Sequence, residues 1–180
     1  MKNNEWYTPA IYIEAAREVM GSIDLDPASS ELANRIVKAE KYYTKEENGL
    51  MYPWYGNVWL NPPYGRTNKY TSSLQQRFIE KLVREDIEQA ILLLLGNACF
   101  RKYFEPLWEY LLCFNQGDIA FFREDGENGH FGFGTLFVYI GNNEEKFIEV
   151  FSQFGPIVKH VSEIKEQTRE LELWSTLQTP

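Results

Sequence analysis

Apolar residues recur along the chain at the three- and four-residue spacing of amphipathic helices, and these stretches predict the helices. The first begins with a Thr-Pro pair and reaches a glycine, which favour a helix start and a helix stop. The last is followed by Gly-Pro, which ends it. The predicted helices cover residues 8–21, 71–86, 100–110 and 144–154.

Short apolar runs between these helices predict strands. Residues 89–95 form a continuous run, as is typical of a parallel strand buried on both faces. Residues 111–122 and 135–140 are joined by a polar, glycine-rich loop, which favours antiparallel pairing. Residues 31–44 are too polar for a firm assignment and allow one helical turn and a weak strand over 36–39. The other predicted strands cover residues 23–26, 58–60 and 157–161.

Strands that alternate with helices and close with an antiparallel pair predict an α/β fold with an open sheet. No repeat or low-complexity tract divides residues 1–162, which we expect to form a single domain. Residues 163–180 are mostly charged or polar. They are expected to be either a docked helix or an interaction segment.

The composition indicates a folded protein, but it does not favour binding to a polyanion. Of the 180 residues, 44% are hydrophobic, and the formal net charge is −8. A nucleic-acid partner therefore requires a local basic patch, a second copy of the chain in a homodimer, or a small contact area. The two cysteines and two histidines lack metal-ligand spacing, so no metal is expected. No apolar run is long enough to span a bilayer, and we expect a cytoplasmic protein.

Residues 57–65 read Asn-Val-Trp-Leu-Asn-Pro-Pro-Tyr-Gly, a short apolar strand that stops at two prolines. Ligands of open α/β sheets bind at the C-terminal ends of strands, which makes this stiff loop a candidate site. The Asn61 side-chain oxygen and the Pro62 carbonyl could accept the two hydrogens of an exocyclic amine, and Tyr64 could stack on the attached ring. The alternative is a proline-rich turn that only ends the strand.

Three motifs occur in order: Glu-Trp-Tyr-Thr-Pro at 5–9, Asp-Leu-Asp-Pro-Ala-Ser at 24–29 and Trp-Leu-Asn-Pro-Pro-Tyr at 59–64. With Phe-Glu-Pro-Leu-Trp at 104–108 and Leu-Cys-Phe at 112–114, they closely resemble the phage-type DNA N-6-adenine methyltransferases. The resemblance covers roughly residues 5–154. It implies a Rossmann-like methyltransferase fold, with a mostly parallel open sheet and a terminal antiparallel hairpin.

The resemblance also implies an activity and an origin. The expected reaction moves a methyl group from S-adenosylmethionine to the N-6 amine of adenine in DNA, and the expected origin is a phage or prophage. By similarity, the catalytic residues are Asn61, Pro62, Pro63 and Tyr64. The cofactor-binding residues are Tyr7, Thr8, Asp24, Asp26, Pro27, Ala28, Ser29 and Asn61.

Two of these residues also have a physical rationale and a structural alternative. Thr8 lies at a helix start, where backbone N–H groups suit the cofactor's carboxylate. Asp26 ends the first predicted strand and could pair with the cofactor's ammonium group. Either residue could instead be a helix N-cap.

The cofactor motif departs from the usual Gly-x-Gly pattern, because Ser29, Ser30 and Glu31 stand in that region. The acidic residue expected about twenty positions further on for the ribose has two candidates, Glu40 and Glu46, so the ribose contact stays unassigned. The missing glycines motivate one rival hypothesis, a methyltransferase-like binding module without catalysis. A second rival keeps the chemistry but acts on a protein glutamine or a cytosine amine.

The target adenine must leave the base stack to reach such a pocket, and this requires contacts to the DNA backbone. Several cations lie in or beside loops that follow predicted strands, at the edge where DNA would approach. Solvated surface charge is the alternative for each of them. The candidate DNA-binding residues are Arg66, Lys69, Arg101, Lys102 and Arg123.

Overall fold

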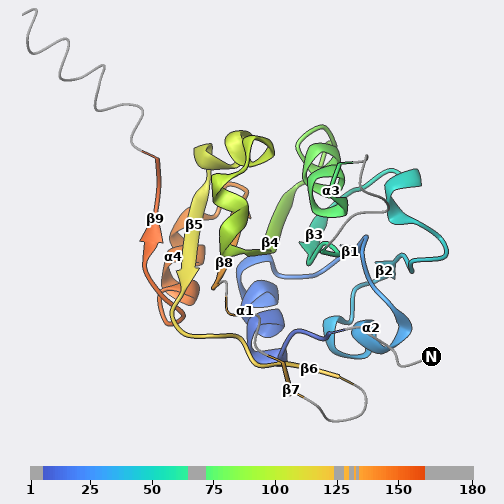
Figure 1. Cartoon of the computed structure of the whole chain (residues 1–180), viewed down its shortest axis with the longest axis horizontal. Helices are drawn as coiled ribbons and strands as arrows, with labels where there is room; N and C mark the ends of the chain where they lie inside the picture. Colours follow the sequence, from blue (N-terminus) through green and yellow to red (C-terminus); the bar gives the residue numbers. More distant parts are fainter. Residues whose placement is uncertain (1–5, 65–71, 124–127, 130–131, 133, 161–180) are drawn as a thin grey trace, which may run out of the picture.

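The computed structural model describes residues 6–64, 72–123, 128–129, 132 and 134–160 (Figure 1). Arg66, Lys69 and the predicted tail over 163–180 lie outside the described residues. Within these ranges, no helix combines the length and the apolar character needed to cross a bilayer.

A seven-stranded sheet forms the centre of the described chain, with the strand order β2-β1-β3-β4-β8-β5-β9. Strands β2, β1, β3 and β4 pair in parallel. Strand β8 pairs antiparallel with β4 and β5, and β9 pairs antiparallel with β5. The strands are β1 (Leu25–Asp26), β2 (Lys41–Tyr42), β3 (Asn57–Leu60), β4 (Gln89–Leu95), β5 (Leu111–Asn115), β8 (Thr135–Ile140) and β9 (Ile157–Val158).

The predicted α/β fold is confirmed, as is the antiparallel pairing of β5 with β8, but the sheet is mixed rather than mostly parallel. The sheet is parallel only at its β2 end and antiparallel at its β9 end. Because β8 lies between β4 and β5 and runs opposite to both, β5 has the same direction as β4. This arrangement is compatible with a methyltransferase-like α/β fold. A separate two-stranded sheet consists of β6 (Phe121–Phe122) and β7 (Asn128–Gly129).

Two hydrophobic cores lie on opposite faces of the sheet. Helices α1 (Ala10–Met20) and α4 (Glu144–Phe151) contribute to the first core, and α3 (Leu74–Leu82) contributes to the second. Along β4, Ile91 belongs to the first core and Leu92 to the second, because successive side chains of a strand point to opposite faces. The other helical segments are α2 (Glu31–Val37), η1 (Gly49–Met51), η2 (Gly96–Phe100) and η3 (Lys102–Glu109).

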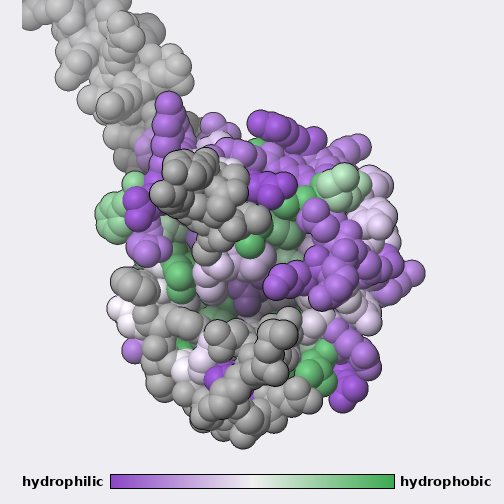
Figure 2. Space-filling model, turned by 45° about the vertical axis from the view of Figure 1, so that its right-hand side comes forward, coloured by the Kyte–Doolittle hydropathy of each residue, from purple (hydrophilic) through white to green (hydrophobic). Residues whose placement is uncertain are grey.

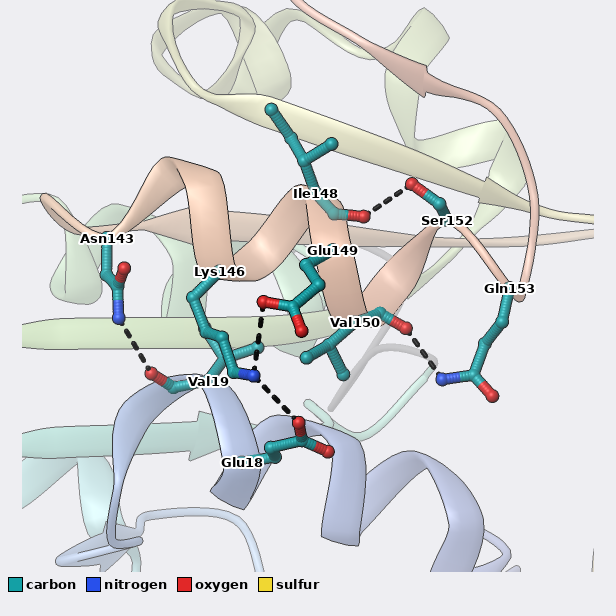
Figure 3. Close-up of polar contacts among 9 residues, drawn as sticks. All are labelled: Glu18, Val19, Asn143, Lys146, Ile148, Glu149, Val150, Ser152 and Gln153. Atoms are coloured by element: carbon teal, nitrogen blue, oxygen red, sulfur yellow. Dashed lines mark hydrogen bonds and ion pairs between the residues drawn. The ribbon is translucent and has the colours of Figure 1, made fainter.

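Polar contacts connect α1 and α4 over the first core (Figure 3). The Lys146 Nζ lies 2.9 Å from the Glu18 Oε1, and the Asn143 Nδ2 donates to the Val19 carbonyl over 3.4 Å. These contacts lie at the periphery of a contact between the helices that is otherwise apolar.

Three local predictions differ from the structure. The weak strand over 36–39 is wrong, because the Ser30 Oγ accepts the Ala33 N–H and starts α2, and β2 follows only at Lys41. In place of the predicted α-helix over 100–110, the chain forms two 3-10 segments, η2 and η3. Segment η3 contains Pro106, a residue without an N–H to donate. The predicted strand over 111–122 is divided into β5 and β6.

The C-terminal ends of the strands that share the direction of β4 meet at one edge of the sheet. Leu95, at the end of β4, pairs with Thr135, which pairs in turn with Asn115 at the end of β5. The Gly96 N–H donates to the Gly134 carbonyl over 3.0 Å and closes this edge. Since β1 and β3 are parallel to β4, the loops that follow them lie at the same edge. Open α/β sheets bind ligands at the C-terminal ends of their strands, so we call this edge the ligand-binding edge.

Two neighbouring residues of α4 test how this helix faces the sheet. Phe147 is fully buried and stacks on Tyr139 with 5.0 Å between ring centroids, whereas Ile148 is 42% exposed. We expect Phe147→Ala to lower the free energy of unfolding by roughly 3–5 kcal/mol, the usual cost of a cavity left by a phenylalanine. Ile148→Ala should cost less than about 1 kcal/mol, since it leaves no buried cavity. Urea unfolding followed by tryptophan fluorescence measures both, and equal losses would contradict the packing described.

Candidate active site

The loop after β3 carries the Asn-Pro-Pro-Tyr motif at the ligand-binding edge of the sheet. Strand β3 is buried along its whole length, which fixes the point where the loop begins. Pro62 is buried and Pro63 is exposed, while Asn61 and Tyr64 are half-buried. The loop is therefore anchored at its start and open to solvent further along.

The Asn61 amide has a partner at each of its polar atoms. Its Nδ2 donates to the Thr8 Oγ1 over 3.2 Å, and its Oδ1 accepts the Tyr64 hydroxyl over 3.1 Å. Burial raises the pKa of the Tyr64 hydroxyl, so this group remains a neutral donor. The structure thus brings together Thr8, Asn61 and Tyr64, three of the residues that the motifs singled out.

Thr8 does not cap the first helix. The N-cap position of α1 is Pro9, which makes no side-chain cap hydrogen bond. The Thr8 side chain instead faces Asn61, and the residue is only 7% exposed. The alternative role of Thr8 as a plain helix cap is therefore wrong, while the N–H groups at the start of α1 remain available for an anionic ligand.

Tyr7 connects this site to the small β6–β7 sheet. Its N–H donates to the Phe122 carbonyl over 2.8 Å, its carbonyl accepts the Phe122 N–H over 3.2 Å, and the two rings lie 5.7 Å apart. Tyr7 is buried. The segment before α1 is thus held between the Asn61 loop and β6.

Asp26, at the C-terminal end of β1, is a buried carboxylate with 3% exposure. Its Oδ1 accepts the Ala28 N–H over 3.1 Å. Burial raises the pKa of Asp26 to about 6, although the nearby Ser29 hydroxyl and the Ala28 N–H act in the opposite direction. The alternative role as a helix N-cap is wrong, because Ser30 occupies that position of α2.

The turn after Asp26 is compact. The Ser29 N–H donates to the Tyr43 carbonyl over 2.9 Å. The Ser29 Oγ is buried close to the Asp26 carboxyl group and lowers its pKa, against the larger effect of burial. The Pro27 backbone contacts Gly49 so closely that a Cβ added at Gly49 would lie 2.1 Å from the Pro27 carbonyl oxygen. Only glycine fits there, so Gly49 holds the turn after Asp26 tightly against the neighbouring segment.

Asp24, another predicted cofactor ligand, has structural partners at the start of β1. Its Oδ2 accepts the Asn57 N–H over 2.8 Å, and its Oδ1 accepts the Ser22 hydroxyl over 2.7 Å. These bonds join the beginnings of β1 and β3, at the end of β1 opposite to Asp26. A cofactor role for Asp24 stays a prediction, and the described contacts give its carboxylate a role in the sheet.

The two ribose candidates lie at opposite ends of β2. Glu40 precedes this strand, and Glu46 follows it on the ligand-binding edge. The neighbouring Glu47 is engaged locally, because its carboxylate accepts the Thr44 N–H over 2.9 Å. Position along the strand therefore favours Glu46 over Glu40.

The candidate DNA-binding cations that the structure describes have different surroundings. Arg101, between η2 and η3, and Lys102, the first residue of η3, are both exposed. Arg123 is half-buried, and its guanidinium carbon lies 5.5 Å from the centroid of the Trp6 ring. Arg101 and Lys102 thus keep the accessibility that a phosphate contact requires, whereas Arg123 is engaged with an aromatic ring.

One surface residue was not identified from the sequence. Phe100 is 86% exposed, more than any other large apolar side chain among the described residues. Phe100 is the last residue of η2, which starts directly after β4. Because a 3-10 helix rises about 2 Å per residue, Phe100 lies within roughly 10 Å of the end of β4 and thus of the ligand-binding edge. Tyr103, three residues later, donates to the Gln75 Oε1 over 3.4 Å and joins η3 to α3. The signal in the sequence that could have identified Phe100 is its position directly before Arg101 and Lys102.

On the face shown in Figure 2, hydrophilic residues cover much of the described surface, mainly on its right-hand side, with small apolar areas among them. The sheet, the buried Asp26 at the end of β1 and the Asn61 loop after β3 are compatible with the methyltransferase class that the motifs resemble.

The chain belongs to the DNA N-6-adenine-methyltransferase (Dam) family, whose pattern it matches over residues 1–130. The family is named for an enzyme that methylates adenine in DNA. The chain is also 44% identical over 63 residues to a DNA N-6-adenine-methyltransferase of Escherichia phage T1. That match covers 34% of this chain and a quarter of the length of the phage protein. No solved structure matches the chain.

The raised pKa of Asp26 predicts that stability falls as pH rises. The carboxyl group has a model-peptide pKa of 3.8 and a folded-state pKa of about 6, so the folded state binds its proton more tightly. The stabilisation is complete below pH 3.8 and is lost as pH rises through about 6, which amounts to roughly 3 kcal/mol. Asp26→Asn carries no such charge and should not show this loss.

The measurement is urea unfolding of wild type and Asp26→Asn at about pH 4 and about pH 7. The free energy of unfolding of the variant, relative to wild type, should increase between the two pH values. Using the difference between the two proteins cancels the titration of the other carboxylates. A difference that does not change with pH would contradict the assignment.

Proposed function

We propose that this protein transfers a methyl group from S-adenosylmethionine to the N-6 amine of adenine in DNA. Family membership supports the reaction class. The observation that carries the proposal is the placement of the Asn61 amide and the Pro62 carbonyl at the ligand-binding edge, next to Thr8 and one strand away from the buried Asp26.

The residues after β1 and before α1 fit the methyl donor. Asp26 is a buried carboxylate whose pKa is raised by desolvation, and a cation placed beside it would offset that cost. The Ser29 hydroxyl is buried nearby without a hydrogen bond at described geometry. The uncapped N-terminus of α1 suits a carboxylate. Asp26 would therefore hold the ammonium group, and the start of α1 the carboxylate, of S-adenosylmethionine.

The chain's own residues would act mainly by positioning and by hydrogen bonding. When bound, S-adenosylmethionine supplies an electrophilic methyl group. The Asn61 Oδ1 and the Pro62 carbonyl would each accept one N–H of the adenine amine, which favours the pyramidal nitrogen whose lone pair is free to react. The amine nitrogen would form a bond to the methyl carbon as the sulfur–carbon bond breaks with its electron pair on sulfur, and the surplus amine proton would pass to water at the solvent-open part of the loop. No ionisable base is required in this scheme.

DNA would approach the same edge of the sheet. Arg101 and Lys102 are exposed close to it and suit phosphate contacts, while the exposed Phe100 ring suits stacking on a base. These local features support DNA binding despite the formal net charge of −8. DNA as the partner is part of the proposal, and nothing in the described residues supports a homodimer.

Methyl transfer to DNA is the direct test. Purified protein is incubated with S-adenosylmethionine carrying a labelled methyl group and mixed-sequence duplex DNA, which is then digested to nucleosides. We expect label in N-6-methyladenine and a loss of about 100-fold or more in Asn61→Ala, in line with the removal of a preorganised polar group from an active site. Asn143→Ala is the matched control, because that amide contacts Val19 at α1 and should keep full activity.

Label in cytosine or in protein glutamine would overturn adenine specificity. A folded protein that binds S-adenosylmethionine in a calorimetric titration and labels none of these substrates would overturn the proposed reaction. If the folded protein does not take up S-adenosylmethionine at all, it is a binding module rather than an enzyme.

Charge and stacking in DNA binding can be separated by their salt dependence. In a fluorescence anisotropy titration with labelled duplex DNA, Arg101→Ala and Lys102→Ala should each weaken binding and lower the slope of log Kd against log salt by about 1. Phe100→Ala should weaken binding without changing this slope, because stacking releases no counterions. The control is Lys159→Ala, since Lys159 pairs with Glu144 beyond β9. Unchanged affinity in all three variants would contradict this DNA surface.

A further inference from the structure

The Asn61 side chain is held from two sides before any substrate binds. Thr8, from the segment before α1, meets its Nδ2, and Tyr64, from the same loop, meets its Oδ1. The two contacts differ in character. Thr8 is only 7% exposed, while Tyr64 is half-buried and lies further along the loop. One partner is therefore fixed in the core, and the other lies where substrate would enter.

The chemistry of the two hydroxyls explains which end of the amide each one meets. Both hydroxyls can donate or accept a hydrogen bond. A phenol is the more acidic of the two and so the better donor, and it pairs with the amide oxygen. The threonine hydroxyl then accepts from the amide nitrogen, as the structure shows. Exchange of the two ends of the amide would replace the stronger pairing with a weaker one.

We propose that Thr8 is a positioning residue that holds the Asn61 amide with its oxygen toward the substrate, and that the Tyr64 hydroxyl occupies this oxygen until the adenine amine replaces it. The inference rests on the proposed function for its substrate. The orientation of the amide itself is a property of the free protein.

Orientation of this amide decides whether the site can accept an amine. The terminal torsion of asparagine is broad, so a neighbour must select one of its two orientations. With the oxygen toward the substrate, Asn61 offers an acceptor to the N–H of adenine. With the nitrogen there, two donors would face each other, and the acceptor would be lost. Thr8, which need not contact adenine, would thus control whether Asn61 can act.

Tyr64 has a second role in this scheme. Its hydroxyl satisfies the Asn61 oxygen in the free protein, which avoids an unpaired acceptor in a half-buried site. When an adenine N–H takes over that oxygen, the Tyr64 hydroxyl gives up this hydrogen bond, and the ring of the same residue would lie against the base. The Asn61 oxygen exchanges one hydrogen bond for another, while breaking its bond to the Tyr64 hydroxyl adds a cost to substrate entry.

The first test compares Thr8→Val with Thr8→Ser. Valine has the shape of threonine but cannot accept the Asn61 N–H, whereas serine keeps the hydroxyl. We expect Thr8→Val to lower kcat about tenfold or more, Thr8→Ser to restore most of kcat, and the calorimetric Kd for S-adenosylmethionine to change less than twofold in both. A weaker Kd with unchanged kcat would overturn the proposal and make Thr8 a cofactor contact only.

The second test uses Tyr64→Phe, which keeps the ring and removes the hydroxyl that competes with the amine. We expect the KM for DNA to fall about threefold, because adenine no longer has to displace a hydrogen bond. A higher KM would overturn the placeholder role of the hydroxyl.

The third test does not depend on activity. The Asn61 side-chain NH₂ is observed by nitrogen-15 NMR of the free protein, and its signals are identified by their absence in Asn61→Ala. In Thr8→Val these signals should shift and exchange faster with water, and in Thr8→Ser they should stay near their wild-type positions. Unchanged signals in Thr8→Val would overturn the inference even if the protein methylates DNA. Wild-type protein that methylates no DNA, but shows the expected shifts, would instead refute the proposed function alone.

Discussion

Burial of β4 on both faces is the constraint on which the arrangement of the sheet depends. Its residues alternate between the two hydrophobic cores, and it pairs with β3 on one side and β8 on the other. Because β3 and β1 are parallel to this strand, their C-terminal ends are brought to the same edge. Asp26 and Asn61 are far apart in the sequence, but this pairing places them at the C-terminal ends of adjacent strands.

Sequence periodicity predicted the long, regular elements well and the short ones poorly. The bounds of β4 and β8 were predicted correctly because both strands are continuous apolar runs. Strand β2 contains only Lys41 and Tyr42, so no alternation exists to detect, and its position was wrong by several residues. The 3-10 geometry of η2 and η3 was also missed, since residues 100–110 have a helical period that does not distinguish an α-helix from a tighter one.

For the site, motifs identified the residue types but not their contacts. The sequence located the Asn-Pro-Pro-Tyr loop after a strand and Asp26 at the end of another, and both positions are confirmed. It did not predict that Thr8 would face Asn61, because that hydrogen bond spans 53 positions and depends on how α1 packs on the sheet. Nor did it predict that Asp24 would bind backbone at the opposite end of β1, since the same motif carries both aspartates.

The segment before α1 has a consequence for the order of folding. Thr8 contacts Asn61, which is 53 positions later in the chain, and Tyr7 pairs with Phe122, which is 115 positions later. During synthesis, these early residues must wait until the chain through β6 has been made. Contacts at such sequence separation form late and slow the folding of a domain. The Asn61 loop would therefore gain its final support only after most of the sheet is assembled.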